Sequence, residues 1–217
     1  MDRTIRVTGT GQLAVQPDTT QLLLTLTGLH EEYSDAVRHS ADAAGRLKEA
    51  LAKAGFEQED LKTVNFSVNS KYESVQDSEG LYKQRFAGFE YDHRLKLEIP
   101  RDNERLGKAL TAFLQSDVAV EFQIVYSVKD PRAAKNELLK NAVEDAKTKA
   151  GQLADAAGVR LGKILHIACP CEEVALRQEV MRSTRFVGET VYTAISPDLE
   201  PDDIRLKESV RVTWEIQ

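Results

Sequence analysis

Hydrophobic and polar residues alternate along several stretches of the chain, and the alternation is most regular at residues 89–99. There the odd positions are Phe, Tyr, His, Leu or Ile, and every even position is charged. A period of two is typical of a strand with one buried and one solvated face. Similar patterns predict further strands at 4–15, 20–29, 64–68, 118–128, 164–168 and 210–216. Because Gln16, Pro17 and Asp18 are turn formers, we expect the first two strands to form a β-hairpin.

Three other segments carry apolar residues every three or four positions, which predicts helices at 34–54, 102–113 and 131–157. Gly55 and Gly158 are suited to end the first and third helices. Asp102 can cap the second, and Asp130 with Pro131 forms an N-cap and N1 pair for the third. The third helix is rich in alanine, so it can approach its neighbour closely. Its predicted buried stripe is Leu139, Ala142 or Val143, Ala146, Ala150, Leu153 and Ala157.

The order ββαββαβαββ predicts an α+β fold of mixed, largely antiparallel sheets with the three helices packed on one side. We expect two fused α+β units, divided near Pro100. The first, residues 1–100, would have the order ββαββ, and the second, residues 101–217, the order αβαββ. In this division the last strand is free to return to the first unit. Residues 172–207 show weak periodicity and predict a long loop or arm.

Composition and net charge limit the classes of partner that this chain can bind. The net charge is −6 at pH 7, whereas binding to nucleic acid needs clustered Lys and Arg, so we expect no nucleic-acid partner. The longest apolar run, 21–29, is far shorter than the roughly 20 residues that span a bilayer, so no transmembrane segment is expected. No signal peptide is visible at the N-terminus, which predicts a cytoplasmic protein. The alternative is an exported protein whose signal peptide is absent from this sequence.

Several segments resemble the SIMPL-domain family, which includes YggE-like and periplasmic immunogenic proteins. They are VTGTGQLAVQPD at 7–18, LKTVNF at 61–66, the strand at 89–99, the Ala-rich helix with Gly158 and Gly162, and SVRVTWEI at 209–216. The resemblance covers nearly the whole chain and implies a bacterial protein without an established reaction. It also implies links to the cell envelope, to oxidative-stress tolerance and to self-assembly.

Two short motifs could suggest chemistry. Residues 9–14 formally match the dinucleotide-binding pattern GxGxxG/A, but no helix can follow them before the next strand. We therefore interpret these glycines as allowing a bend or close packing in a strand. Cys169 and Cys171 flank Pro170. Two thiols are too few for a structural zinc site, so they are either structural or a redox-responsive pair.

No catalytic constellation is evident. His93 lies on the apolar face of its strand and is either a buried base or, more simply, a core histidine with satisfied hydrogen bonds. His30, His39 and His166 are scattered, and neither HExxH nor GxSxG occurs. We predict no catalytic, cofactor-binding or metal-binding residues, no cofactor, and no enzymatic activity.

Two features of residues 172–207 point to partners. The acidic run 198–203 could attract a basic protein or be an ordinary solvated loop. Residues 184–195 mix aromatic and β-branched side chains, so they could pair with a neighbouring subunit or form a local hairpin. We predict a homo-oligomeric, non-enzymatic protein that acts as a scaffold or a stress-related binding module. The alternatives are a domain that binds a small ligand or peptide between its two units, and an enzyme whose site combines residues distant in sequence.

Overall fold

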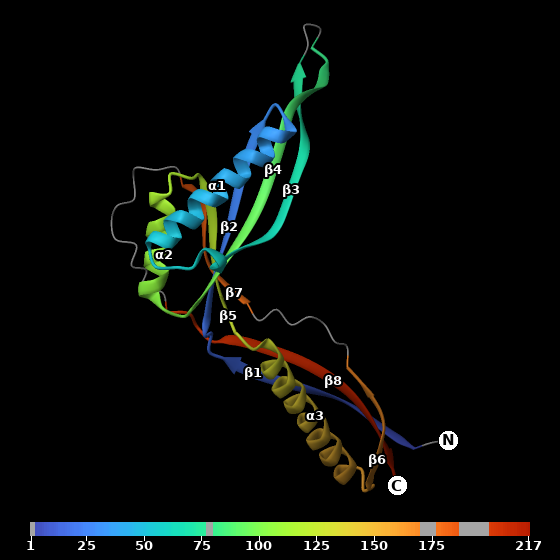
Figure 1. The fold of residues 1–217 in the computed structure, drawn as a ribbon. Coiled ribbons are helices and arrows are strands. Elements are labelled where there is room, and N and C mark those ends of the chain that lie inside the picture. Colours follow the sequence, from blue (N-terminus) through green and yellow to red (C-terminus); the bar gives the residue numbers. More distant parts are fainter. Residues whose placement is uncertain (1–2, 77–79, 170–176, 187–199) are drawn as a thin grey trace. The chain divides into compact units, whose positions relative to one another are not determined.

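The chain divides into two compact units, each with its own core. The computed structural model describes residues 3–76, 80–169, 177–186 and 200–217. One unit combines Met1–Asp18, Ser127–Gln178 and Asp202–Gln217, and the other combines Thr19–Tyr126 and Glu179–Pro201. We call them the α3 unit and the α1–α2 unit after their helices (Figure 1).

The α3 unit is a three-stranded sheet with one helix on one face. In spatial order its strands are β1 (Thr4–Val15), β8 (Ile204–Ile216) and β6 (Leu161–Ala168), and its helix is α3 (Pro131–Ala156). Strands β1 and β8 pair antiparallel without interruption, from Thr4 opposite Glu215 to Val15 opposite Ile204. The two ends of the described chain therefore share one sheet.

Glycines in β1 let α3 lie unusually close to the sheet. A Cβ atom at Gly9 would lie 2.1 Å from the carbonyl oxygen of Ala142, and one at Gly11 would lie 2.1 Å from that of Leu138. The facing stripe of α3 is buried and consists of alanines and one leucine: Ala134, Leu138, Ala142, Ala146, Ala150 and Ala154. Close packing is thus the role of the glycines in the GxGxxG/A match, as the sequence predicted.

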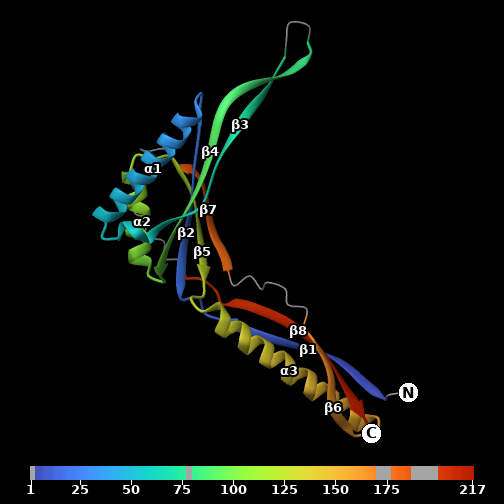
Figure 2. The ribbon, with the colours of Figure 1, turned by 45° about the vertical axis from the view of Figure 1, so that its right-hand side comes forward.

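The α1–α2 unit is a five-stranded sheet covered on one face by two helices (Figure 2). In spatial order its strands are β3 (Leu61–Gln76), β4 (Tyr82–Pro100), β2 (Thr19–His30), β5 (Val120–Ser127) and β7 (Arg177–Phe186). Its helices are α1 (Tyr33–Lys53), α2 (Asn103–Gln115) and the short 3-10 helix η1 (Gln58–Asp60). Leucines of β2 and β4 pack against Leu47 and Leu51 of α1 and against Leu106 and Leu110 of α2 in one continuous core.

The predicted α+β class, with largely antiparallel sheets and helices on one side of them, is confirmed. The predicted hairpin between the first two strands is wrong, because β1 and β2 belong to different sheets. The backbone N–H of Asp18 donates to the carbonyl of Ser127, and the N–H of Lys129 donates to the carboxylate of Asp18. Asp18 therefore ties the segment after β1 to residues 127–129 within the α3 unit.

The predicted boundary at Pro100 is also wrong. The α3 unit draws on three separate stretches of the chain, and the α1–α2 unit runs unbroken from Thr19 to Tyr126. Pro100 only ends β4, opposite Thr19. The predicted arm at 172–207 is likewise not all loop, because β7 lies within it beside β5, and β8 begins at Ile204. Residues 170–176 and 187–199 lie outside the described part of the chain.

Candidate functional site

His93 bridges three elements of the α1–α2 unit. Its Nδ1 is hydrogen-bonded to Ser40 Oγ of α1, and its Nε2 to Thr63 Oγ1 of β3, each at 2.9 Å. A neutral imidazole has one donor and one acceptor nitrogen, so one hydroxyl donates to the ring and the other accepts from it. The rings of His93 and Phe66 are roughly perpendicular, with centroids 5.2 Å apart.

This environment argues against His93 as a catalytic base. Ser40 is 1% exposed and His93 is 9% exposed, so the hydrogen-bonded pair that they form is shielded from a substrate. Burial is the largest effect and lowers the pKa of His93; the hydrogen bond with Ser40 opposes it, the charge of Lys48 lowers the pKa again, and Asp92 raises it least. The neutral ring therefore serves as a buried polar link between the helix and the sheet.

The other histidines do not converge on a site. His30 stacks on His39, with ring centroids 4.3 Å apart, and on Tyr91 at 6.0 Å. His166 lies on β6 of the α3 unit. Within the described residues, no group of three or more His, Cys, Asp or Glu side chains is placed to hold a metal ion. Cys169 packs half-buried against the core of the α3 unit, whereas Pro170, Cys171 and the segment 187–195 lie outside the described residues.

The most conspicuous surface feature is a row of aromatic rings on the α1–α2 unit, which we call the aromatic ladder: Tyr33, Phe89, Phe86 and Tyr72. Successive rings meet edge to face, with centroids 5.8, 5.2 and 5.7 Å apart. Tyr33 is 54% exposed, Tyr72 58% and Phe86 46%, while Phe89 is anchored against the core. Contiguous exposed rings of this kind mark interaction sites on soluble proteins.

A β-bulge brings the ladder onto one face. Phe86 and Phe89 are three residues apart, so in a regular strand their side chains would point to opposite faces. The register of β3 and β4 shifts between Lys71 and Tyr72, because Lys71 pairs with Gly88 and Tyr72 with Phe86. The extra residue in β4 turns Phe86 to the side of Phe89. Gly88 has φ +136°, and a Cβ there would lie 2.5 Å from the carbonyl oxygen of His30.

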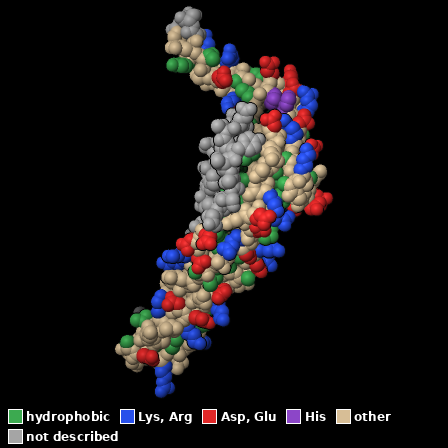
Figure 3. All heavy atoms as spheres, turned by 90° about the vertical axis from the view of Figure 1, so that its left-hand side faces the viewer, with side chains coloured by type: hydrophobic (Ala, Val, Ile, Leu, Met, Phe, Trp, Pro, Cys, Tyr) green, Lys and Arg blue, Asp and Glu red, His purple; other side chains and the backbone are tan. Residues whose placement is uncertain are grey.

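The ladder continues onto a two-stranded arm. Strand β2 ends where His30 pairs with Phe89, whereas β3 and β4 go on pairing to Gln76 and Tyr82. Residues 71–76 and 82–88 therefore form a ribbon that extends past α1 (Figures 1 and 2). In Figure 3, green hydrophobic side chains lie along this arm, and histidines, in purple, lie near its base. Cross-strand ion pairs join Lys71 to Glu90 and Arg85 to Glu73.

A hollow of about 340 Å³ lies between the end of α1 and the start of α2. Its cations are already engaged: the Arg105 guanidinium lies 5.2 Å from the centre of the Phe56 ring, and Lys108 Nζ lies 2.7 Å from Glu104. The hydrogen bond to Glu104 raises the pKa of Lys108. The carboxylate of Asp102 caps α2 by accepting from Glu104 N and Arg105 N. These groups stabilise the helix and offer little to a ligand.

Comparison with known proteins places the chain in a family. Residues 5–214 match the family SIMPL, described as a protein of unknown function (DUF541). The chain belongs to the SIMPL family. This SIMPL chain is also 30% identical over 164 residues to the 26 kDa periplasmic immunogenic proteins of Brucella melitensis and Brucella abortus. The matches cover 76% of this chain and 65% of each relative, so they span slightly less than two thirds of the relatives' length.

Among solved structures, this SIMPL protein matches a Bacillus cereus protein related to NIF3 at 11% identity and a TM-score of 0.24. The match covers 70% of this chain and 38% of the other. A score this low carries no argument about fold or activity. In the described part of the SIMPL chain, no helix has the length and apolar character needed to span a bilayer.

Proposed function

We propose that this SIMPL protein is a non-enzymatic scaffold that self-associates through the arm of the α1–α2 unit. The supporting observation is the aromatic ladder, to which the edge strand β3 contributes Tyr72; among the described strands, β3 has a neighbour, β4, on one side only. An isolated two-stranded ribbon is at best marginally stable in water. A second copy that covered the ladder would remove exposed aromatic surface from water and add a neighbour to the ribbon.

Strand β3 has the properties of a pairing edge. Proteins protect such edges with proline, inward-pointing charges or bulges. Strand β3 contains no proline, and it exposes Val64, Phe66 and Tyr72. Register shifts lie between Thr63 and Asn65 and between Lys71 and Tyr72, but the extra residue of the second shift is in β4, so β3 itself runs from residue 65 to 76 without an extra residue. This stretch is long enough for strand addition by another chain.

The charges of β3 favour a second copy of the same chain as the occupant. If two β3 strands pair antiparallel about a twofold axis at Tyr72, Lys71 of one copy lies opposite Glu73 of the second copy. Such pairing is isologous, so both contacts form twice. Opposite charges directly across an antiparallel pair are favourable. The two Tyr72 rings meet at the axis and extend each ladder into the other.

The absence of catalysis is part of the proposal. It is supported by the low exposure of Ser40 and His93. An activity built on this hydrogen-bonded pair would need the core to open before a substrate could reach it. The stress-related role rests on the family resemblance alone. The names of the Brucella relatives favour the exported alternative over the predicted cytoplasmic location, and cell fractionation of the expressed full-length protein tests it.

Sedimentation velocity over a range of protein concentrations tests the association. We expect the wild type to form a concentration-dependent species larger than a monomer. Replacing Tyr72 and Phe86 by Ser should weaken the association constant by about tenfold or more, because a desolvated aromatic pair contributes well over 1 kcal/mol. Leu153→Ser is the matched control, because Leu153 is also exposed, at 52%, but lies on α3. A monomeric wild type, or equal effects of both changes, would contradict the proposal.

Charge reversal tests the partner and register. Lys71→Glu or Glu73→Lys alone places like charges opposite each other twice in the dimer, so each should weaken association. The double variant restores opposite charges across the axis, so it should associate more tightly than either single variant, even though residues 71 and 73 then face like charges at Glu90 and Arg85 of their own chain. If the double variant is weaker than both, β3 does not pair with itself around Tyr72. The far-ultraviolet circular dichroism of each variant reports whether the sheet is intact.

A further inference from the structure

The face of the three-stranded sheet opposite α3 carries an excess of positive charge. Since Val7, Val210 and Val212 pack against α3, the alternate residues of β1 and β8 point to the opposite face. That face carries four exposed cationic side chains: Arg6, Arg205, Lys207 and Arg211. The only carboxylate at these alternate positions is Glu215. A basic face is unexpected in a chain whose net charge is −6.

Arg211 is central on this face. It lies on the middle strand, directly opposite Thr8 of β1 and Ala168 of β6. Thr213, the next residue of β8 on the same face, pairs with Arg6 on one side and His166 on the other. Arg6 and His166 are therefore diagonal neighbours of Arg211, at about 7–8 Å between backbones. Across the described residues, Arg211 forms no ion pair.

A hollow of about 540 Å³ opens beside Arg211 within the α3 unit. Its lining comprises Thr8, His166, Ile167, Ala168, Cys169, Ser209 and Arg211. The small side chain of Ala168 leaves room on the β6 side of Arg211. The volume falls in the range of small-molecule sites, about 300–1,000 Å³. Unlike the hollow beside α2, this one contains a guanidinium without a carboxylate partner in the described chain.

We propose that this hollow binds the phosphate group of a small phosphate monoester. A guanidinium can donate two parallel hydrogen bonds to a phosphate, and the hydroxyls of Thr8 and Ser209 and the ring of His166 supply further donors on the same lining. A phosphate monoester carries nearly two negative charges at neutral pH. Arg6, a diagonal neighbour of Arg211 outside the lining of the hollow, adds a second positive charge on the same face. This inference is independent of the association through β3, which lies in the other unit.

A nucleic-acid strand fits this face less well. Proteins that hold single strands stack the bases on aromatic side chains between their basic residues. At the alternate positions of β1 and β8 on this face, and at His166 and Ala168 of the described β6, there is no Phe, Tyr or Trp. Charge and hydroxyl donors, without a stacking platform, favour a compact anion over a polymer.

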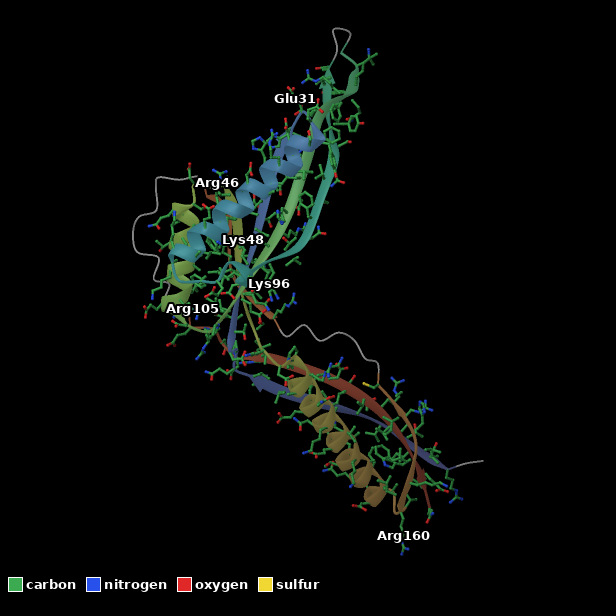
Figure 4. The ribbon with its side chains drawn as sticks, viewed as in Figure 1. Glu31, Arg46, Lys48, Lys96, Arg105 and Arg160 are labelled. Atoms are coloured by element: carbon green, nitrogen blue, oxygen red, sulfur yellow. The ribbon has the colours of Figure 1, made fainter. Side chains whose placement is uncertain are left out.

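Titration of the full chain with glycerol phosphate tests the site, followed by the amide resonances of Thr8, Ser209 and Arg211. We expect saturable shifts at these residues. Arg211→Gln should weaken binding by about tenfold or more, because hydrogen bonds to charged groups are the strong ones. Ala168→Phe should abolish binding, because the larger side chain fills the hollow. It leaves every charge in place, so it separates the effect of the hollow from that of the charge. Arg46→Gln is the matched control, since Arg46 is an exposed arginine on α1 of the other unit (Figure 4).

Four results would show that this hollow is not a phosphate site. No shifts at these residues, or equal binding by wild type and Arg211→Gln, overturns the proposal. Tight binding by Ala168→Phe shows that diffuse charge attracts the anion and that the hollow is not a site, which also overturns it. Inorganic phosphate and acetate are titrated in parallel. Weaker binding of acetate than of both phosphates supports phosphate recognition, whereas acetate binding as tight as that of glycerol phosphate overturns it.

Discussion

The close approach of α3 to β1 predicts a large effect of adding a single methyl group. In Gly9→Ala the new Cβ would lie 2.1 Å from the oxygen of Ala142 and 2.6 Å from Cβ of Ala146. Ordinary contacts begin near 3.4 Å, so α3 must retreat from β1 by more than about 1 Å. A gap of that size forfeits roughly a quarter to a half of the dispersion energy of the atoms that line it.

The atoms that lose contacts are those of the α3 core, where Val210, Val212 and Trp214 pack against the alanine stripe. Overpacking costs about 1–3 kcal/mol, and the loosened core adds to it. We expect Gly9→Ala to lower the free energy of unfolding of the α3 unit by about 2–4 kcal/mol. That is a large share of the roughly 5–15 kcal/mol available to a natural domain.

Urea unfolding followed by tryptophan fluorescence measures this effect directly. Trp214 is the single tryptophan of the chain and is buried in the α3 core, so its emission reports this unit. Gly151→Ala is the control on the same helix, because nothing lies within 4 Å of a Cβ there. It should stabilise the unit by about 0.5–1 kcal/mol, since glycine is a poor helix former. A loss below about 0.5 kcal/mol for Gly9→Ala would refute the packing account.

The hydrogen bonds of His93 and the N-cap Asp130 each give a testable effect on stability. Because the pKa of His93 is lowered in the folded protein, the unfolded chain binds a proton at this residue more readily. The free energy of unfolding of the wild type should therefore be highest above about pH 6.5 and should fall as the pH drops from there through the folded-state pKa. The free energy of unfolding should fall by about 1.4 kcal/mol for each unit by which the pKa of His93 is lowered on folding. Urea midpoints measured across this pH range should depend less on pH in His93→Gln than in the wild type. Asp130→Ala removes the cap that accepts from Arg132 N and Ala133 N. This change should lower the free energy of unfolding of the α3 unit by about 1 kcal/mol, measured by urea unfolding followed by Trp214 fluorescence. An unchanged urea midpoint would mean that the cap is dispensable.

Local signals in the sequence were sufficient for most elements. Asp102 and Asp130 accept the expected N-terminal hydrogen bonds, and Pro131 occupies the first turn of α3. Gly55 and Gly158 have positive φ angles just after their helices. The strict alternation at 89–99 became the buried and exposed faces of β4. These features depend on neighbours only a few residues away, and that is why a pattern reveals them.

Long-range choices were not predictable in the same way. The pattern of β1 does not distinguish pairing with β2 from pairing with β8, which lies about 200 residues further along the chain. The stripe of α3 was also misassigned in part. Leu153 is 52% exposed, whereas the smaller Ala154 is buried. Size usually favours burying the leucine, but the buried row repeats every four residues through Leu138, Ala142, Ala146 and Ala150, which places Ala154 in the row and Leu153 beside it.

The candidate sites also depend on register. Phe86 and Phe89 share a face only because of the bulge opposite Lys71 and Tyr72. Arg211 meets His166 and Ala168 only because β6 returns beside β8. Neither arrangement leaves a motif of adjacent residues. The alternation of Arg205, Lys207 and Arg211 with apolar residues in the last strand was the one local sign of a basic face.

Hydrogen exchange of β3 tests the central claim, that copies of this protein join through this edge, more directly than any other measurement. Exchange of peptides covering residues 61–76 is compared at protein concentrations above and below that at which the larger species forms. We expect the amides of residues 65–76 to be protected only in the associated protein, and we expect Lys71→Glu to remove this protection. Association without any change in the exchange of β3 would contradict it.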